Sequence, residues 1–165
     1  MLTALALILG GLLNRLRGGL FSDLMAAIAD ATGWRAARWL SRQRTQIMRA
    51  LYAVPTGLLA WHVLGRPQWW LAALLIVSVF AGQAFFGNGG YLRDRGVRWP
   101  DWLGMARNLV SFAPAAFVSW PFLAAMVVNG AFHAALYWAA FRTGRDSRLG
   151  EILVGAAVWA TIINV

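Results

Sequence analysis

Long apolar runs separated by clusters of arginine constrain the fold of this chain more than any other feature. All fifteen basic residues are arginines, and every one except Arg66 falls on the same side if the apolar runs cross a membrane. The clusters on that side are Arg15 and Arg17; Arg35, Arg38, Arg42, Arg44 and Arg49; Arg93, Arg95, Arg98 and Arg107; and Arg142, Arg145 and Arg148. An excess of arginine in short loops marks the cytoplasmic side. The pattern therefore predicts both the class of fold and its orientation.

The composition supports the same interpretation. Apolar residues make up 60% of the chain and charged residues 13%, whereas soluble domains average roughly 45–50% and 25%. The net charge of +9 favours anionic lipid headgroups as partners rather than nucleic acid, because the arginines alternate with apolar runs and do not form one basic face. The absence of cysteine excludes a disulfide framework and a thiolate nucleophile. We predict an integral membrane protein.

The apolar runs predict an all-α, polytopic transmembrane bundle in one domain, residues 1–165. The six expected spans are Leu2–Asn14, Ile47–Leu64, Gln68–Gly87, Leu103–Val118, Pro121–Phe141 and Gly150–Asn164. The first, fourth and sixth are short for a bilayer that needs about 20 residues. Both termini would lie outside a bacterial inner membrane, with the arginine-rich loops in the cytoplasm. In an alternative, Leu2–Ala29 forms one bent hairpin and leaves five full spans.

The segment before the second span has the pattern of an interfacial helix. Four of its arginines (Arg35, Arg38, Arg42 and Arg49) recur at helical spacing after Gly33, and Trp34 and Trp39 can lie at the headgroup level. This combination is typical of an amphipathic helix on the cytoplasmic surface. A solvated charged linker is the alternative.

Two parts of the chain resemble each other. Pro55 precedes Trp61 by six residues, and Pro114 precedes Trp120 by the same spacing. Arg49 or Arg107 precedes each Pro-to-Trp segment, so the pattern suggests a repeated helical hairpin over residues 47–87 and 105–141. In a chain this rich in alanine and tryptophan, the match can also arise by chance.

Polar residues inside the predicted spans are candidates for a vestibule open to the cytoplasm. Asn129, His133 and Tyr137 are four residues apart and share one helix face, while Gln83 and Glu151 lie in the inner halves of other spans. The alternative is that these groups form hydrogen bonds between helices. A histidine metal site is not expected, because the second histidine lies near the opposite boundary, and no cofactor is predicted.

A second candidate site combines arginine with glycine at the cytoplasmic face. Arg15 and Arg17 adjoin a glycine turn, and Arg49 and Arg107 begin the two hairpin copies. Guanidinium groups beside glycine amides can bind an anion or a lipid headgroup. The plain alternative is that glycine makes the turns and arginine sets the orientation.

Small residues suggest close helix contacts. Ala156 and Ala160 have small-xxx-small spacing, and Gly82 lies in the third span. Such faces can pack within one chain or between chains, and we expect a homo-oligomer.

The motifs Arg15-Leu-Arg-Gly-Gly19 and Gly150-Glu-Ile-Leu-Val-Gly155 resemble small multi-spanning membrane proteins of phages and prophages. That group implies a phage or bacterial membrane context and no particular activity. The leading hypothesis is a non-enzymatic protein that binds anionic headgroups or anions and has a small-solute or ion pathway. One alternative is a phage-type effector acting as a holin or in superinfection exclusion. The other is an intramembrane enzyme on a lipid phosphate, for which His133, Glu151 and Asp94 would be the available groups.

Overall fold

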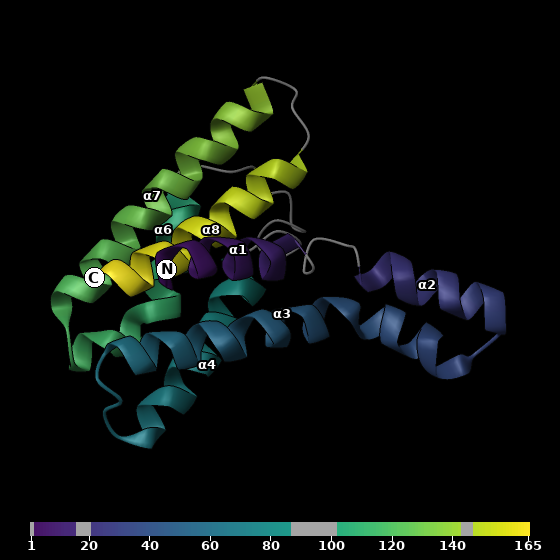
Figure 1. Ribbon diagram of the computed structural model, residues 1–165, viewed down its shortest axis with the longest axis horizontal. Helices are drawn as coiled ribbons and strands as arrows, with labels where there is room; N and C mark the ends of the chain where they lie inside the picture. Colours follow the sequence, from purple (N-terminus) through teal and green to yellow (C-terminus); the bar gives the residue numbers. More distant parts are fainter. Residues whose placement is uncertain (1, 16–20, 87–101, 143–146) are drawn as a thin grey trace.

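The fold is all-helical over the residues that the structure describes, as the sequence predicts. The computed structural model describes residues 2–15, 21–86, 102–142 and 147–165 (Figure 1). Its elements in chain order are α1 (Leu2–Arg15), α2 (Phe21–Thr32), α3 (Arg35–Val63), α4 (Trp69–Phe86), α6 (Trp102–Phe112), the 3₁₀ helix η2 (Ala113–Phe117), α7 (Trp120–Arg142) and α8 (Ser147–Asn164).

The helices pack into a bundle with an apolar centre. α1 lies along α8, α4 lies between α3 and α6, and α7 contacts both α6 and α8. Leu71 and Leu75 of α4 and Met126 of α7 are fully buried in the core. Phe112 and Phe122 pack edge to face across α6 and α7, with ring centroids 6.1 Å apart. Such pairs add to the free energy gained by burial.

Glycine allows α1 and α8 to approach closely. A Cβ atom on Gly10 would lie 2.5 Å from the Gly155 carbonyl oxygen and 2.7 Å from Cγ of Trp159. A Cβ on Gly11 would lie 3.8 Å from Cβ of Ala156. The small residues of α8 that were expected to mediate close packing therefore include one that packs within the chain, against α1.

The proline-containing segment between the predicted fourth and fifth spans separates two helices, as expected. α7 begins at Trp120, so Pro121 occupies its first turn, where its missing N–H costs nothing. The Ser119 hydroxyl accepts a hydrogen bond from the Phe122 amide at 3.2 Å, which caps this helix end. The predicted fourth span is itself divided, because α6 ends at Phe112 and the chain continues as η2 around Pro114.

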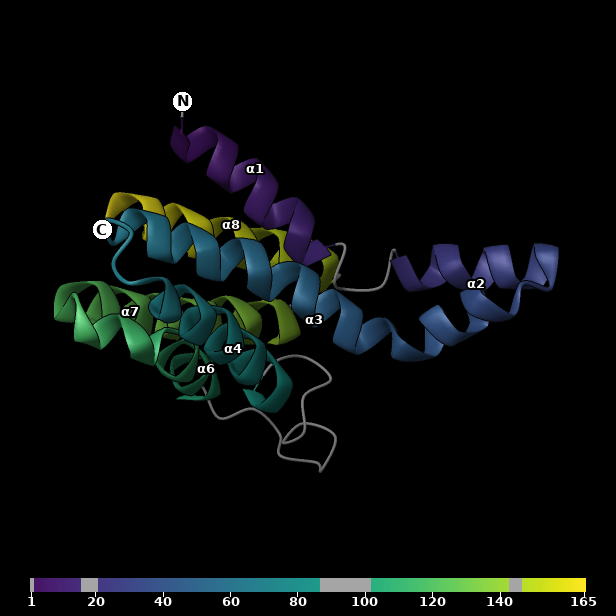
Figure 2. The same cartoon turned by 90° about the horizontal axis from the view of Figure 1, so that it is seen from below.

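Both termini lie at one end of the bundle, together with the α3–α4 turn and the start of α7 (Figures 1 and 2). The last residue of α1, the first half of α3, the end of α7 and the start of α8 carry arginines and belong to the other end, while Arg107 lies in the middle of α6. Arg66, in the α3–α4 turn, is the exception among the described residues.

An extension that we call the arm projects from the arginine-rich end (Figures 1 and 2). It consists of α2 and residues 35–46 of α3, which pack against each other. Gly33 ends α2 with a φ of 66°, a conformation that glycine adopts without steric cost. The segment expected as an interfacial helix and the expected second span are thus one continuous helix of 29 residues.

By length and apolar composition, one described helix, Trp69–Phe86, is able to span a membrane. Shorter apolar helices cover Ala4–Leu13, Trp120–Phe132 and Ile152–Asn164.

Candidate functional site

Arg107 and Asn108, side by side on α6, form the centre of a buried polar network. Arg107 is 3% exposed, and its Nε and Nη2 donate hydrogen bonds of 3.3 and 3.2 Å to Oδ1 of Asn108. Nδ2 of Asn108 donates to the Met126 carbonyl at 2.8 Å. The amide nitrogen of Asn108 is bonded to α7, and its amide oxygen accepts from the Arg107 guanidinium. Asn108 thus helps to position Arg107.

Asn129 continues this network from α7 to α8. Its Oδ1 accepts a hydrogen bond of 3.4 Å from Asn108, and its Nδ2 donates to the Ala157 carbonyl at 3.2 Å and to Oγ1 of Thr161 at 2.6 Å. Of the two interpretations that the sequence allows for Asn129, its described contacts are those of hydrogen bonding between helices. The network joins α6, α7 and α8 through one buried amide.

A second buried hydrogen bond ties α8 to α3. Nε1 of Trp159 donates to Oγ1 of Thr56 at 3.2 Å, and both side chains are buried. Buried tryptophan N–H groups normally find such an acceptor. Trp159 therefore packs against α1 through its ring and is oriented by α3 through its nitrogen.

Polar side chains also line the contact between α4 and α6. A Cβ on Gly82 would collide with the Ser111 hydroxyl and lie 2.9 Å from the Arg107 carbonyl oxygen. Gln83, the next residue of α4, is 5% exposed. The Ser111 hydroxyl is buried without a hydrogen-bond partner. The close approach permitted by Gly82 thus brings the Ser111 side chain and the Arg107 backbone of α6 against α4.

Arg49 lies on α3 at the beginning of the bundle. It is 6% exposed, and its Nη1 donates to Oε1 of Gln46 at 3.3 Å. Arg49 and Arg107 thus both have buried side chains rather than exposed positions at the helix ends. Buried guanidinium groups of this kind can hold an anion in a fixed position.

The remaining predicted site residues are placed only through their helices. His133 and Tyr137 belong to α7, and because α7 is unbroken from Trp120 to Arg142 they keep the four-residue spacing from Asn129. Glu151 and Arg15 lie on α8 and α1, but the side chains of all four lie outside the described residues. Arg17, like Asp94, lies outside the described backbone as well. Within the described residues, no group of three histidine, cysteine or acidic side chains could hold a metal ion.

Several network residues were not predicted from the sequence. The missed residues are Thr56, Asn108, Ser111 and Thr161. Asn108 and Ser111 had a detectable signal, because with Arg107 they place three polar groups within five residues of an apolar run. Thr56 and Thr161 had none, since threonine is tolerated on any face of an apolar helix by bonding its own backbone, as Thr161 does to Ala157 at 2.8 Å.

In comparisons with known proteins, no family model, curated protein or solved structure matches this chain.

Proposed function

We propose that the chain is a non-enzymatic integral protein of a bacterial inner membrane whose arginine-rich cytoplasmic end binds anionic lipid headgroups. The observation that carries the proposal is that large apolar side chains are exposed around the bundle while polar side chains are buried within its apolar core. Charged or amide side chains are buried at Arg49, Gln83, Arg107, Asn108 and Asn129. Large apolar side chains, in contrast, are exposed on every bundle helix from α1 to α8.

Several exposed apolar side chains occur on each of these helices. On α1, the exposed residues are Leu5, Leu7, Ile8, Leu9 and Leu12. On α4, Leu74 and Val77 are exposed, as are Val128 and Phe132 on α7. Soluble monomers rarely expose contiguous apolar patches above a few hundred Å². Lipid acyl chains would cover such faces, and the same environment favours polar groups that are paired inside the bundle.

Six crossings account for the arrangement of the helices. They would be α1, the second half of α3, α4, α6 with η2, α7 and α8, and they place both termini with the α3–α4 turn on the outer side. Trp69 and Trp120 are 79% and 70% exposed at that end, as expected for an aromatic belt. α1 has 14 residues, or about 21 Å of helix, and would require a locally thin bilayer.

The arginines divide into two groups by exposure. Arg35 and Arg38 in the arm are exposed and are the better candidates for headgroups in the leaflet. Arg49 and Arg107 are buried, so they suit an anion or phosphate group held within the inner end of the bundle. Arg15 and Arg17 would add charge at the same end.

Membrane integration and orientation can be tested together because the chain has no cysteine. Single cysteines at Gln68 and Ala27 place one thiol in the α3–α4 turn and one in the arm, both at exposed positions. In intact cells, a membrane-impermeant maleimide should label Gln68→Cys, and it should label Ala27→Cys only after permeabilisation. Release of the protein by alkaline carbonate, or the opposite labelling pattern, would exclude the proposal.

A solute pathway is a second candidate, favoured by the buried network from Arg107 through Asn129 to Thr161. Polar groups inside a bundle mark ion and proton pathways in many membrane proteins. Purified protein in liposomes should then conduct anions or protons above the level of empty liposomes, and Asn129→Ala and His133→Ala should change the flux. Equal flux in empty liposomes and in liposomes that contain the protein would exclude a solute pathway.

A further inference from the structure

The arm has two outer faces of opposite charge. Ala29 of α2 and Ala37 of α3 are buried in the arm, at 2% and 0% exposure. Positions 23, 27 and 30 of α2 lie about 100–160° around the helix from Ala29, at about 100° of rotation per residue. Asp23 and Asp30 are exposed on that side, with the small residue Ala27 between them. The outer face of α2 is therefore acidic.

The outer face of α3 is basic and aromatic. Arg35, Arg38 and Trp39 lie away from Ala37 by the same helical geometry, and all three are exposed. Trp39 is 59% exposed, and Trp34, which precedes the helix, is 55% exposed. Arginine beside tryptophan is the composition of helices that lie in the headgroup region. Exposed indole rings are unfavourable in water and favourable at that depth.

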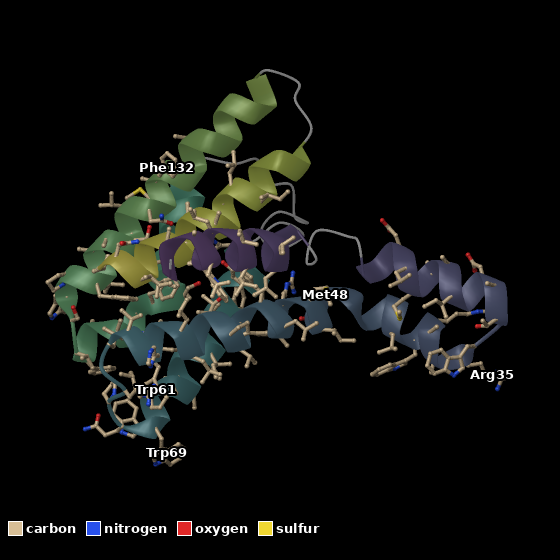
Figure 3. All side chains as sticks on the ribbon, viewed as in Figure 1. Arg35, Met48, Trp61, Trp69 and Phe132 are labelled. Carbon is tan, nitrogen blue, oxygen red and sulfur yellow. The ribbon has the colours of Figure 1, made fainter. Side chains whose placement is uncertain are left out.

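The arm lies beyond the arginine-rich end of the bundle, and its two helices face different sides. Figure 3 places Arg35 at the far end of the arm and Trp69 at the opposite end of the molecule. Figures 1 and 2 both show α3 on the side of the arm where α4 lies, with α2 on the other side. Because the arm continues α3 beyond the arginine-rich end of the bundle, docking requires α3 to bend toward this side where it leaves the bundle.

We infer that the arm docks on an anionic lipid surface through the Arg35, Arg38 and Trp39 face of α3, and that the Asp23 and Asp30 face of α2 stays in water. The inference rests on the proposed membrane integration and adds a specific surface to it. Charge complementarity selects the occupant: a surface of anionic headgroups attracts the α3 face and repels the α2 face. Docking through the α2 face is therefore disfavoured, because it would place the aspartates against anionic headgroups and the arginines in water.

The test compares two matched alanines, Ala36 beside Trp39 at the edge of the α3 face and Ala27 on the α2 face. Ala36 on α3 and Ala27 on α2 are both exposed, so Ala36→Cys and Ala27→Cys can each carry an environment-sensitive fluorophore. In vesicles of phosphatidylglycerol and phosphatidylcholine, the label at position 36 should be quenched by nitroxide lipids and protected from iodide. The label at position 27 should show the reverse. In phosphatidylcholine alone, or at high salt, the difference should shrink.

Neutral variants test the charge argument. Arg35→Gln with Arg38→Gln should lower the ratio of docked to undocked arms roughly thirtyfold, which follows from the usual contribution of two arginines at an anionic surface. Arg66→Gln removes an exposed arginine at the opposite end and should leave the quenching unchanged. Circular dichroism in the same vesicles checks that each variant keeps its helix content.

Two results would overturn the inference while membrane integration stands. Equal iodide access at positions 27 and 36 in anionic vesicles would show that the arm does not dock. Protection that also occurs in phosphatidylcholine and rises with the protein-to-lipid ratio would assign the α3 face to a second copy of the chain. Release of the protein from the vesicles by carbonate would instead contradict the proposed function itself.

Discussion

Asn129 makes three hydrogen bonds to other helices. Its amide links Asn108 of α6 to Thr161 and the Ala157 carbonyl of α8. Hydrogen bonds between membrane helices contribute about 0.6 kcal/mol on average and up to about 1.7. Asn129→Ala should therefore lower the free energy of unfolding by about 2 kcal/mol, measured by denaturant titration in mixed micelles.

Asn164 provides the matched control. Its Nδ2 donates to the Ala160 carbonyl of its own helix at 2.7 Å, in an exposed position, so Asn164→Ala should change the free energy of unfolding by less than about 0.5 kcal/mol. If the two variants unfold at the same denaturant concentration, the Asn129 network contributes nothing to stability.

Gly82 is constrained by the backbone of α6 as well as by a side chain. Gly82→Ala should cost about 1–3 kcal/mol, because the added methyl group overpacks a tight contact. Combining it with Ser111→Ala or Ser111→Gly removes the hydroxyl but leaves the Arg107 carbonyl oxygen 2.9 Å from the new Cβ. The double variants should therefore remain less stable than wild type in the same titration. Full recovery in either would show that the side chain alone sets the constraint.

The sequence indicates site residues where a polar group interrupts an apolar run, and the structure buries Asn129, Gln83, Arg49 and Arg107. It does not indicate their partners. The contact between Trp159 and Thr56 joins residues 103 positions apart, and no local pattern encodes which helices are neighbours. A buried threonine also looks the same in sequence as one that faces lipid.

At the scale of the elements, helix positions are well predicted, and the start of α7 is predicted from Pro121. The expected third and fifth spans differ from α4 and α7 by one residue at each end. α3 is the main exception, because hydropathy falls at the arginines while the backbone stays helical from Arg35. Where a helix passes from lipid into water, its side chains become more polar, but its backbone hydrogen bonds continue unbroken. Pro114 shows the converse, since it divides an apolar run that hydropathy treats as one span.

The contact between α1 and α8 can be tested by a cross-link. An ideal Cβ at Gly11 lies 3.8 Å from Cβ of Ala156, which equals the usual Cβ separation of about 3.8 Å in disulfides. In the absence of other cysteines, Gly11→Cys with Ala156→Cys should oxidise to an intramolecular disulfide. Loss of maleimide reactivity after denaturation in SDS, without a dimer band on a non-reducing gel, would show it.

Two controls define the outcome for this pair. Ala36→Cys with Ala156→Cys places one thiol in the arm, and both thiols should stay reactive in SDS after the same oxidation. Gly11→Cys alone reports contacts between copies. If Gly11→Cys alone forms disulfide-linked dimers as fast as the double variant forms its disulfide, α1 packs against another chain.

At the scale of the whole molecule, one end carries nearly all of the described arginines, so anionic lipid should stabilise the fold. A ligand that binds only the folded state raises the free energy of unfolding by mass action, and each arginine near an anionic surface contributes about 1 kcal/mol. The melting temperature in nanodiscs should therefore be higher with phosphatidylglycerol than with phosphatidylcholine. The difference should fall at 1 M salt, where the screening length is about 3 Å. Arg35→Gln with Arg38→Gln should reduce the difference, while Arg66→Gln should preserve it, since Arg66 lies in the α3–α4 turn at the other end. If the Arg66 variant loses as much as the arm variant, the stabilisation reflects net charge and not the arginine-rich end.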